Sequence, residues 1–383
     1  MSRAIPSAPT LRVDTLVTNR FRTQYLPGIR SRHTPKRSLN ELLTDPASGR
    51  PTRGRSVQSI TPSTEPDDRL FVIDCDTGID DALALGYMLA RHGDRLVAVT
   101  TVFGNVSVAQ ATINTLDLLA VAGRPDISVH TGAATSLDGA FAGTAHRVHG
   151  TNGFGGVALP TSARQPSAES APAAIVRLAH EYSGRLVIIA VGPPTNLAIA
   201  LSMDPSIATL IDEVVVMGGA VQHAGNATPV AEANIWHDPE AAQRVFASAM
   251  RVRMVPLDAT MRQRLTAADA AQLQASSSAT ARLIGEALDH YLGFYEDVFG
   301  LQECALHDPL AVAVAVGDES VLHEARSPIT VELANGPSRG ATIVDLRRAY
   351  HGPVAVEGAR NRVVLRTEDD FGSRLVAALL TLP

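Results

Sequence analysis

Residues 70–90, LFVIDCDTGIDDALALGYMLA, place a group of aspartates between two apolar segments. The aspartates are Asp74, Asp76, Asp80 and Asp81. Apolar segments bury themselves when a chain folds, and carboxylates at their junction cost free energy unless positive charge neutralises them. The stretch therefore predicts a folded core with a site for a cation at its edge.

Short apolar segments alternate with helical segments from residue 69 onward. RLFVID (69–74) is typical of a buried parallel strand, and DDALALGYMLARHG (80–93) has helical periodicity with acidic residues in its first turn. Further strand-like segments are 95–104, 185–192, 213–220 and 251–259, and further helical segments are 107–123, 195–203 and 238–248. This alternation predicts an α/β fold with an open, mainly parallel, Rossmann-like sheet and helices on both faces.

Residues 1–68 differ from the rest of the chain. They are rich in Arg, Ser, Pro and Thr and show no sustained period of a helix or strand, so we expect a disordered N-terminal extension. A translation start further along the chain, an organellar transit peptide and a regulatory tail are three alternatives that stay open for this segment. We expect residues 69–383 to form a single domain.

Composition excludes several classes of function. Residues 1–66 carry 11 basic and 4 acidic side chains, whereas the remaining residues carry 22 basic and 35 acidic ones, and this acidic body argues against nucleic acid as a partner. No run of about 18 apolar residues is present, so we expect no membrane span. Cys75 and Cys304 are too few and too far apart for a disulfide framework, so we expect a cytoplasmic protein.

Four polar segments each follow a predicted strand, namely DCDTGIDD, VFGN, AVGPPTN and MGGA. Because ligands of open α/β sheets bind at the carboxyl ends of the strands, we expect these segments to line one crevice. A hard cation such as Ca²⁺ takes six to eight oxygen ligands, which suits the aspartates. The group of aspartates is not accompanied by the set of cysteines or the closely paired histidines that would suggest zinc.

The aspartates also fit two alternative roles, and both stay open. Asp80 or Asp81 can cap the helix that follows, although capping does not account for the aspartates of the strand end. A strand that ends in D-x-D also opens the haloacid-dehalogenase-type phosphatases, which use Mg²⁺. Those enzymes usually have Thr or Val where Gly78 stands and a lysine downstream, but the only lysine, Lys36, lies upstream.

The segment DCDTGIDDA (74–82) resembles the opening signature of the inosine-uridine-preferring nucleoside hydrolases, D-x-D-x-G-x-D-D-A. The resemblance continues in chain order through residues 100–123, 148–156, 190–201, 214–220, 225–242 and 305–313. It implies a nucleoside hydrolase catalytic domain over 69–383 that hydrolyses the N-glycosidic bond of ribonucleosides, purine or pyrimidine, to free base and ribose. It also implies dependence on Ca²⁺ and a homo-oligomer, either a dimer or a tetramer.

Carried over by position, the resemblance implies a set of calcium ligands. These are the carboxylates of Asp76, Asp81 and Asp308 and the backbone carbonyl of Val191. A bound metal lowers the pKa of its water, and Asp76 is expected to take a proton from that water as it attacks the sugar. The reaction must also stabilise a cation-like ribosyl group and help the base to leave.

The same resemblance implies the residues that bind ribose. Asp80 is expected to bind the 2′-hydroxyl. Asn226, Glu232 and Asn234 are expected to bind the other hydroxyls, Glu232 and Asn234 towards the 5′ end, and Asn105 is expected to be a further active-site amide. Buried polar groups of this kind reject sugars that lack the matching hydroxyl.

Two histidines and two tyrosines are expected near the base and the ribose. His307 is expected to protonate the leaving base, the alternative being a cap for the helix that starts at Asp308. Tyr291 and Tyr295 lie one helical turn apart and share a face, where they contact the base or only pack in the core. His149 is expected to cover the ribose on a mobile flap. A catalytically decayed nucleoside- or calcium-binding protein is the non-enzymatic alternative.

Overall fold

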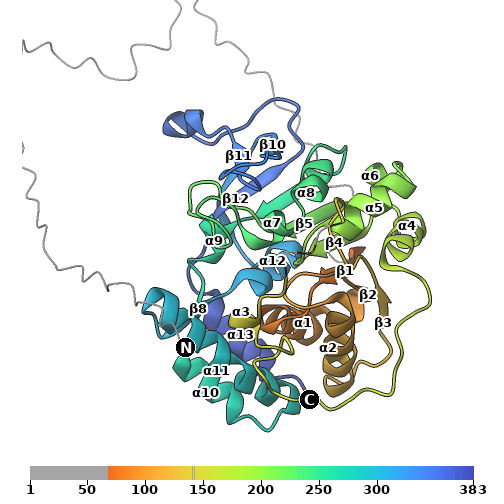
Figure 1. The fold of residues 1–383 in the computed structure, drawn as a ribbon, viewed down its shortest axis with the longest axis vertical. Helices are drawn as coiled ribbons and strands as arrows, with labels where there is room; N and C mark the ends of the chain where they lie inside the picture. Colours follow the sequence, from red (N-terminus) through yellow and green to blue (C-terminus); the bar gives the residue numbers. More distant parts are fainter. Residues whose placement is uncertain (1–67, 140, 142) are drawn as a thin grey trace, which may run out of the picture. The chain divides into compact units, whose positions relative to one another are not determined.

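An eight-stranded sheet with helices on both faces forms the centre of the structure (Figure 1). The computed structural model describes residues 68–139, 141 and 143–383, so the expected N-terminal extension, 1–68, lies almost entirely outside the described residues. The strands in sheet order are β3 (Ser128–Thr131), β2 (Leu96–Thr101), β1 (Leu70–Cys75), β4 (Leu186–Ala190), β5 (Glu213–Met217), β6 (Val252–Val255), β12 (Arg362–Thr367) and β9 (Val321–Arg326). Neighbouring strands are parallel except at β9, which pairs antiparallel with β12.

Both faces of the sheet are buried. In β1, Phe71 and Ile73 pack into one apolar cluster, whereas Val72 packs into a second cluster on the opposite face. Strands that are buried on both sides need apolar residues at every position, which explains why the sequence shows continuous apolar runs rather than alternation. The predicted α/β fold with a mainly parallel sheet is confirmed.

Two groups of helices cover these faces (Figure 1). One face carries α1 (Ile79–His92), α2 (Val108–Val121), α10 (Ala267–Gln274), α11 (Ala279–Phe299), α12 (His307–Val316) and α13 (Phe371–Leu379). The other face carries α4 (Ala171–Glu181), α5 (Thr195–Met203), α6 (Ile207–Leu210) and α8 (Pro239–Phe246).

The smaller elements connect these layers. They are the helices α3 (His146–His149), α7 (Ala233–His237) and α9 (Leu257–Thr260), the 3₁₀ helices η3 (Gly93–Arg95) and η4 (Arg347–His351), and the two-stranded sheets β7 (Arg264–Thr266) with β8 (Glu303–Ala305) and β10 (Ile329–Val331) with β11 (Thr342–Val344). Among the described helices, none is long and apolar enough to cross a membrane.

The strand order reverses between β1 and β4. The chain leaves β1 to build β2 and β3 on one side, and it then returns to build β4, β5 and β6 on the other side. The connections that leave β1 and β4 therefore diverge, and such a reversal opens a crevice at the carboxyl ends of the two strands. The polar segments that follow β1 and β4 begin at this crevice.

The buried centre of the sheet predicts a large cost for truncation. Ile188 on β4 is 0% exposed, so Ile188→Ala should lower the free energy of unfolding by about 2–5 kcal/mol through lost burial and the cavity left behind. Urea unfolding followed by circular dichroism measures this loss. The matched control is Ile343→Ala on β11, since Ile343 is 54% exposed and should change stability by less than about 0.5 kcal/mol. Equal losses in the two variants would contradict the buried position of Ile188.

Candidate active site

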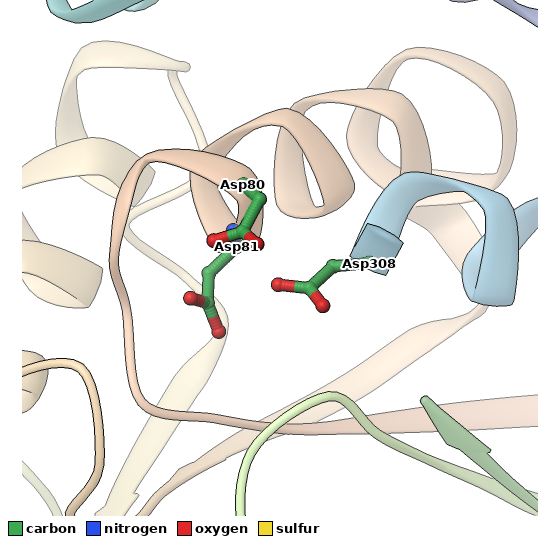
Figure 2. Close-up of side chains that lie close together, drawn as sticks. All are labelled: Asp80, Asp81 and Asp308. Carbon is green, nitrogen blue, oxygen red and sulfur yellow. The ribbon is translucent and has the colours of Figure 1, made fainter. Parts of the chain in front are cut away.

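Three carboxylates meet at the crevice. Asp80 and Asp81 lie in the first turn of α1, and Asp308 lies in the first turn of α12. Figure 2 shows the Asp308 carboxylate pointing towards that of Asp81, and one carboxylate oxygen from each of the three residues lies within 4.8 Å of the others. The positive ends of two helix dipoles thus point at this cluster and offset part of its negative charge.

Asp81 is fixed by the turn that precedes α1. Its Oδ2 accepts hydrogen bonds from the Gly78 amide at 2.8 Å and from the Asn105 side chain at 3.1 Å. Its Oδ1 accepts from the Asp76 amide at 3.2 Å. The residue at the N-cap is Gly78, so neither Asp80 nor Asp81 is the N-cap, although Asp81 holds the capping amide from the third helical position.

Asp76 lies beside the cluster but is not a member of it. Its Oδ2 accepts a hydrogen bond of 2.6 Å from the Asn105 amide, whereas its Oδ1 is buried and has no hydrogen-bond partner. Asp308 Oδ2 is also buried without a partner. The three carboxylates that lie closest together are therefore those of Asp80, Asp81 and Asp308. The sequence analysis had instead grouped Asp76 with Asp81 and Asp308.

The two buried carboxylate oxygens without a hydrogen-bond partner indicate whether a cation would fit this site. Among the described residues, no arginine or lysine forms an ion pair with Asp76, Asp80, Asp81 or Asp308, and of the two pocket histidines only His149 comes within ion-pair distance, 3.8 Å from Asp80 Oδ1. Buried carboxylate oxygens without a partner are rare in proteins. An all-oxygen donor set of this kind fits a hard divalent cation such as Ca²⁺ or Mg²⁺.

The raised pKa values of these carboxylates also favour a bound cation. Burial, with the repulsion of Asp80 added for Asp81, raises the pKa of Asp80 and of Asp81 to about 6. Burial and the neighbouring carboxylates raise the pKa of Asp76 and of Asp308 well above the ordinary range. A bound cation would reverse these shifts and keep the carboxylates ionised at neutral pH.

The carboxyl ends of β4 and β5 complete the cation side of the crevice. The Val191 carbonyl accepts a hydrogen bond of 2.8 Å from the Asn234 side chain. A carbonyl oxygen has a second lone pair, so this bond leaves Val191 able to bind a cation as well. The Asn234 amide group also donates to the Met217 carbonyl at 3.2 Å, which ties α7 to both strands.

Most of the predicted site residues line one pocket at this place. They are Asp80, Asn105, His149, Val191, Asn226, Glu232, Asn234, Tyr291, His307 and Asp308. Asp76, Asp81 and Tyr295 do not line it but lie directly behind it, where they contact Asn105 or His307. The convergence predicted from the strand ends is therefore present in the structure.

Backbone amides hold the Glu232 side chain in place within the pocket. Glu232 is the N-cap of α7, and its two carboxylate oxygens accept hydrogen bonds from the amides of Gly219, Asn234 and Ile235 at 2.9, 2.9 and 3.1 Å. Burial raises the Glu232 pKa, and the amides oppose this shift by stabilising the ionised form. Asn226 lies nearby, and its Oδ1 accepts from the Ala233 amide at 2.9 Å.

His307 is the first residue of α12, and both of its ring nitrogens have partners. Nδ1 lies 2.8 Å from the Thr260 hydroxyl, and Nε2 lies 2.9 Å from the Tyr295 hydroxyl. The N-cap of α12 is Leu306, so the alternative that His307 caps this helix is wrong. Burial lowers the His307 pKa to about 3, so the ring is neutral at physiological pH.

The two tyrosines share a face of α11, as their spacing predicts. The ring centroids of Tyr291 and Tyr295 are 5.2 Å apart with an edge-to-face geometry. The Tyr291 hydroxyl donates to Asp80 Oδ2 at 3.4 Å, and its ring stacks on His149 with centroids 5.6 Å apart. Aromatic and hydrogen-bond contacts thus run from the carboxylate cluster to His307.

The sequence analysis did not assign some residues of the site. Met217 and Ala233 line the pocket, and Thr260 contacts His307. Met217 ends a strand in the segment MGGA, so the strand-end rule could have identified it. Thr260 has no local signal, because its partner lies 47 residues further along the chain. Cys75 and Cys304 are buried and unpaired, in agreement with the absence of a disulfide framework.

Comparison with known proteins agrees with this geometry. The family model described as inosine-uridine preferring nucleoside hydrolase matches residues 71–370. The chain is 36% identical to uridine nucleosidase 1 of Arabidopsis thaliana over 72% of this chain and 81% of that protein. It is 35% identical to the pyrimidine-specific ribonucleoside hydrolase RihA of Salmonella dublin over 72% of this chain and 88% of that protein.

Solved structures are similar as well. A plant nucleoside hydrolase matches with a TM-score of 0.74 and 33% identity, covering 82% of this chain and 100% of its own. A purine-preferring ribonucleoside hydrolase from Gardnerella vaginalis matches with a TM-score of 0.75 and 32% identity, covering 82% of this chain and 98% of its own. These matches leave no support for the phosphatase alternative. The buried carboxylates at the strand reversal, the pocket beside them and these similarities together place the chain in the nucleoside hydrolase family, as a ribonucleoside hydrolase.

Proposed function

We propose that this enzyme hydrolyses ribonucleosides in a calcium-dependent reaction, with uridine among its preferred substrates. The observation that carries the proposal is the group of Asp80, Asp81 and Asp308, whose buried carboxylate oxygens lie within 4.8 Å of one another beside the pocket. The names of the curated relatives, uridine nucleosidase and pyrimidine-specific ribonucleoside hydrolase, support the choice of uridine.

Asp76, Asp81, Asp308 and the Val191 carbonyl would hold the cation. When bound, Ca²⁺ supplies positive charge that favours ionisation of a water molecule and binding of the vicinal ribose hydroxyls. Asp76 is a metal ligand in this proposal. Asp80, which lines the pocket, binds the ribose 2′-hydroxyl.

Asp76 accepts the proton of the attacking water in this proposal. Its Oδ2 is held by the Asn105 amide at 2.6 Å, and its unpartnered Oδ1 is the atom that can take the proton. Glu232 and Asn234 orient the 5′ end of the ribose, and Asn226 and Asn105 bind its remaining polar groups. Because backbone amides fix Glu232 and Asp81, little reorganisation is needed when substrate binds.

His307 and Tyr295 serve the leaving base. The bond between ribose C1′ and the base nitrogen breaks with its electron pair moving to the base, which then takes up a proton. A His307 pKa of about 3 argues against an imidazolium as donor. The hydrogen-bonded pair of His307 and Tyr295 instead gives one proton to the base as the bond breaks, and solvent returns a proton to the pair before the next turnover, with Thr260 fixing the ring.

Three broader predictions belong to the same proposal. Residues 69–383 act as one catalytic domain, since the sheet takes strands from β1 near residue 70 to β12 near residue 367. The enzyme works as a homo-oligomer, either a dimer or a tetramer, and in the cytoplasm. These three remain predictions drawn from the sequence.

Removal of the cation should abolish turnover. Uracil release from uridine should stop after treatment with EDTA and return when Ca²⁺ is added back, because the buried carboxylates then regain their counter-ion. Asp308→Asn should lower kcat/KM by about 10²-fold or more at the same Ca²⁺ concentration. The control Asp345→Asn changes an exposed carboxylate and should have no effect. Full activity in EDTA would exclude a metal requirement.

The cluster also predicts how stability depends on pH. Without a cation, the folded-state pKa of Asp80 and Asp81 is about 6, above the unfolded value of about 3.9. The folded state then binds more protons than the unfolded state, so stability falls as pH rises from about 4 to about 6. Thermal unfolding at about pH 5 and about pH 7.5 should show a larger Tm increase on adding Ca²⁺ at the higher pH. A larger increase at the lower pH would contradict the carboxylate cluster as the binding site.

His307 and Tyr295 should matter most for poor leaving groups. His307→Ala should lower kcat on uridine by about 10²-fold or more, and Tyr295→Phe should lower it less, since proton transfer to the base is lost or weakened. With 4-nitrophenyl riboside, whose leaving group needs no proton, both losses should shrink to less than about tenfold. Steady-state kinetics on the two substrates measure this. Equal losses on both substrates would show that His307 and Tyr295 do not protonate the base.

A further inference from the structure

Helix α2 presents a buried amide side chain to the active site. Asn114 is only 4% exposed, although it lies in a helix whose other inward residues include Ala111 and Leu118. Its Nδ2 donates to the Thr77 carbonyl at 3.0 Å and to the Asn152 carbonyl at 2.9 Å. One side chain thus joins the turn between β1 and α1, which leads from Asp76 into the first turn of α1, to the loop of residues 149–157.

A hydrogen bond from Gln110 fixes the orientation of the Asn114 amide. Gln110, one turn earlier on α2, donates from Nε2 to Asn114 Oδ1 at 2.9 Å. This contact identifies Oδ1 as the acceptor and leaves both Nδ2 protons for the two carbonyls. The hydrogen-bonding capacity of Nδ2 is therefore fully used in one geometry.

The loop of residues 149–157 is built to approach Asn114 closely. Gly153 has a φ of +78°, and a Cβ at this position would lie 2.8 Å from Asn114 Nδ2 and 3.1 Å from the Thr77 carbonyl. Only glycine tolerates both the conformation and the contact. The buried Phe154 and the hydrogen bond of 2.8 Å from the Gly155 amide to the His149 carbonyl hold the rest of the loop.

His149 is the residue that this loop delivers to the pocket. Its Nδ1 accepts a hydrogen bond of 3.2 Å from the Ile79 amide, and it lies 3.8 Å from Asp80 Oδ1. An accepting Nδ1 means that the neutral ring carries its proton on Nε2. The position of His149 therefore requires a fixed separation between two segments, the first turn of α1 and the loop of residues 149–157.

We propose that Asn114 is a positioning residue that fixes His149 against Asp80 on the ribose side of the pocket by joining the β1–α1 turn to the loop of residues 149–157. It touches neither substrate nor cation and acts only through His149. Without Asn114, the Thr77 and Asn152 carbonyls lose their common donor, and the loop can move away from α1. The inference rests on the proposed function, since it concerns the ribose side of that site.

A double-mutant cycle in the full-length protein tests this role. Asn114→Ala should lower kcat/KM for uridine about tenfold when His149 is present, because groups that act as a unit are not additive. In the His149→Ala background the same change should cost less than about twofold. A loss of the same size in both backgrounds would overturn the proposal, because a general loss of structure does not depend on His149.

A matched control separates positioning from stability. Asn361 is also 4% exposed and donates from Nδ2 to the Phe246 carbonyl at 2.9 Å, but it lies away from the pocket. Asn361→Ala should lower Tm as Asn114→Ala does while kcat/KM changes by less than about twofold. If Asn114→Ala does not fold, Gln110→Ala replaces it in the cycle, since that change frees the Asn114 amide to rotate, and the same two outcomes decide.

Hydrogen exchange supplies a readout that does not need turnover. The Ile79 amide donates to His149, so it should exchange faster in Asn114→Ala than in the wild-type protein, while core amides of β4 keep their protection. Unchanged protection of Ile79 would overturn the proposal even if activity fell. If the wild-type protein releases no base from any ribonucleoside, the proposed function is refuted. The exchange of the Ile79 amide then decides the role of Asn114 by itself.

Discussion

Negative charge buried at the reversal of strand order is the constraint on which the rest of the structure depends. Asp76, Asp80, Asp81 and Asp308 lie where water is excluded, and their burial and mutual repulsion raise their pKa values. The fold offsets this repulsion only in part, through two helix N-termini and a few backbone amides. A site with that much uncompensated charge favours ligands that bring positive charge, and a divalent cation with an oxygen-rich sugar satisfies both the charge and the hydrogen bonds.

The remaining polar groups are held in place by the backbone rather than by one another. Glu232 is fixed by three amides, Asp81 by two amides and the Asn105 side chain, and Asn234 by the carbonyls of two strands. Backbone groups of a sheet and of helix ends move little, so the site is preorganised before substrate binds. In the proposed function the two ends of the substrate would therefore meet different chemistry, with carboxylates and amides at the ribose and His307 with tyrosines at the base.

The sequence predicted most of this arrangement because its signals are local. Continuous apolar runs identified β1, β4 and β5, and the rule that ligands bind at strand ends placed Asn105 and Val191 in one pocket, with Asp76 directly behind it. Strand β9 was not predicted, since its exposed and buried residues do not alternate, and the 21-residue length of α11 was not predicted either. Contacts such as that of Thr260 with His307 depend on the folded chain and leave no local pattern.

Helix α2 shows why periodicity alone could not reveal how the site is held. Its inward face carries Thr112, Asn114 and Thr115, all buried, where a helix chosen for stability alone would carry apolar side chains. Each of these groups has a partner, as the Thr115 hydroxyl has with that of Thr77 at 2.7 Å, so none adds the cost of an unsatisfied group. The helix thus gives up apolar burial for hydrogen bonds, those of Asn114 and Thr115 to Thr77 in the turn before α1 and those of Thr112 to Thr101 and Thr131. Since an apolar face would suffice to pack the helix, its polar character is best explained by the geometry that it imposes on the active site.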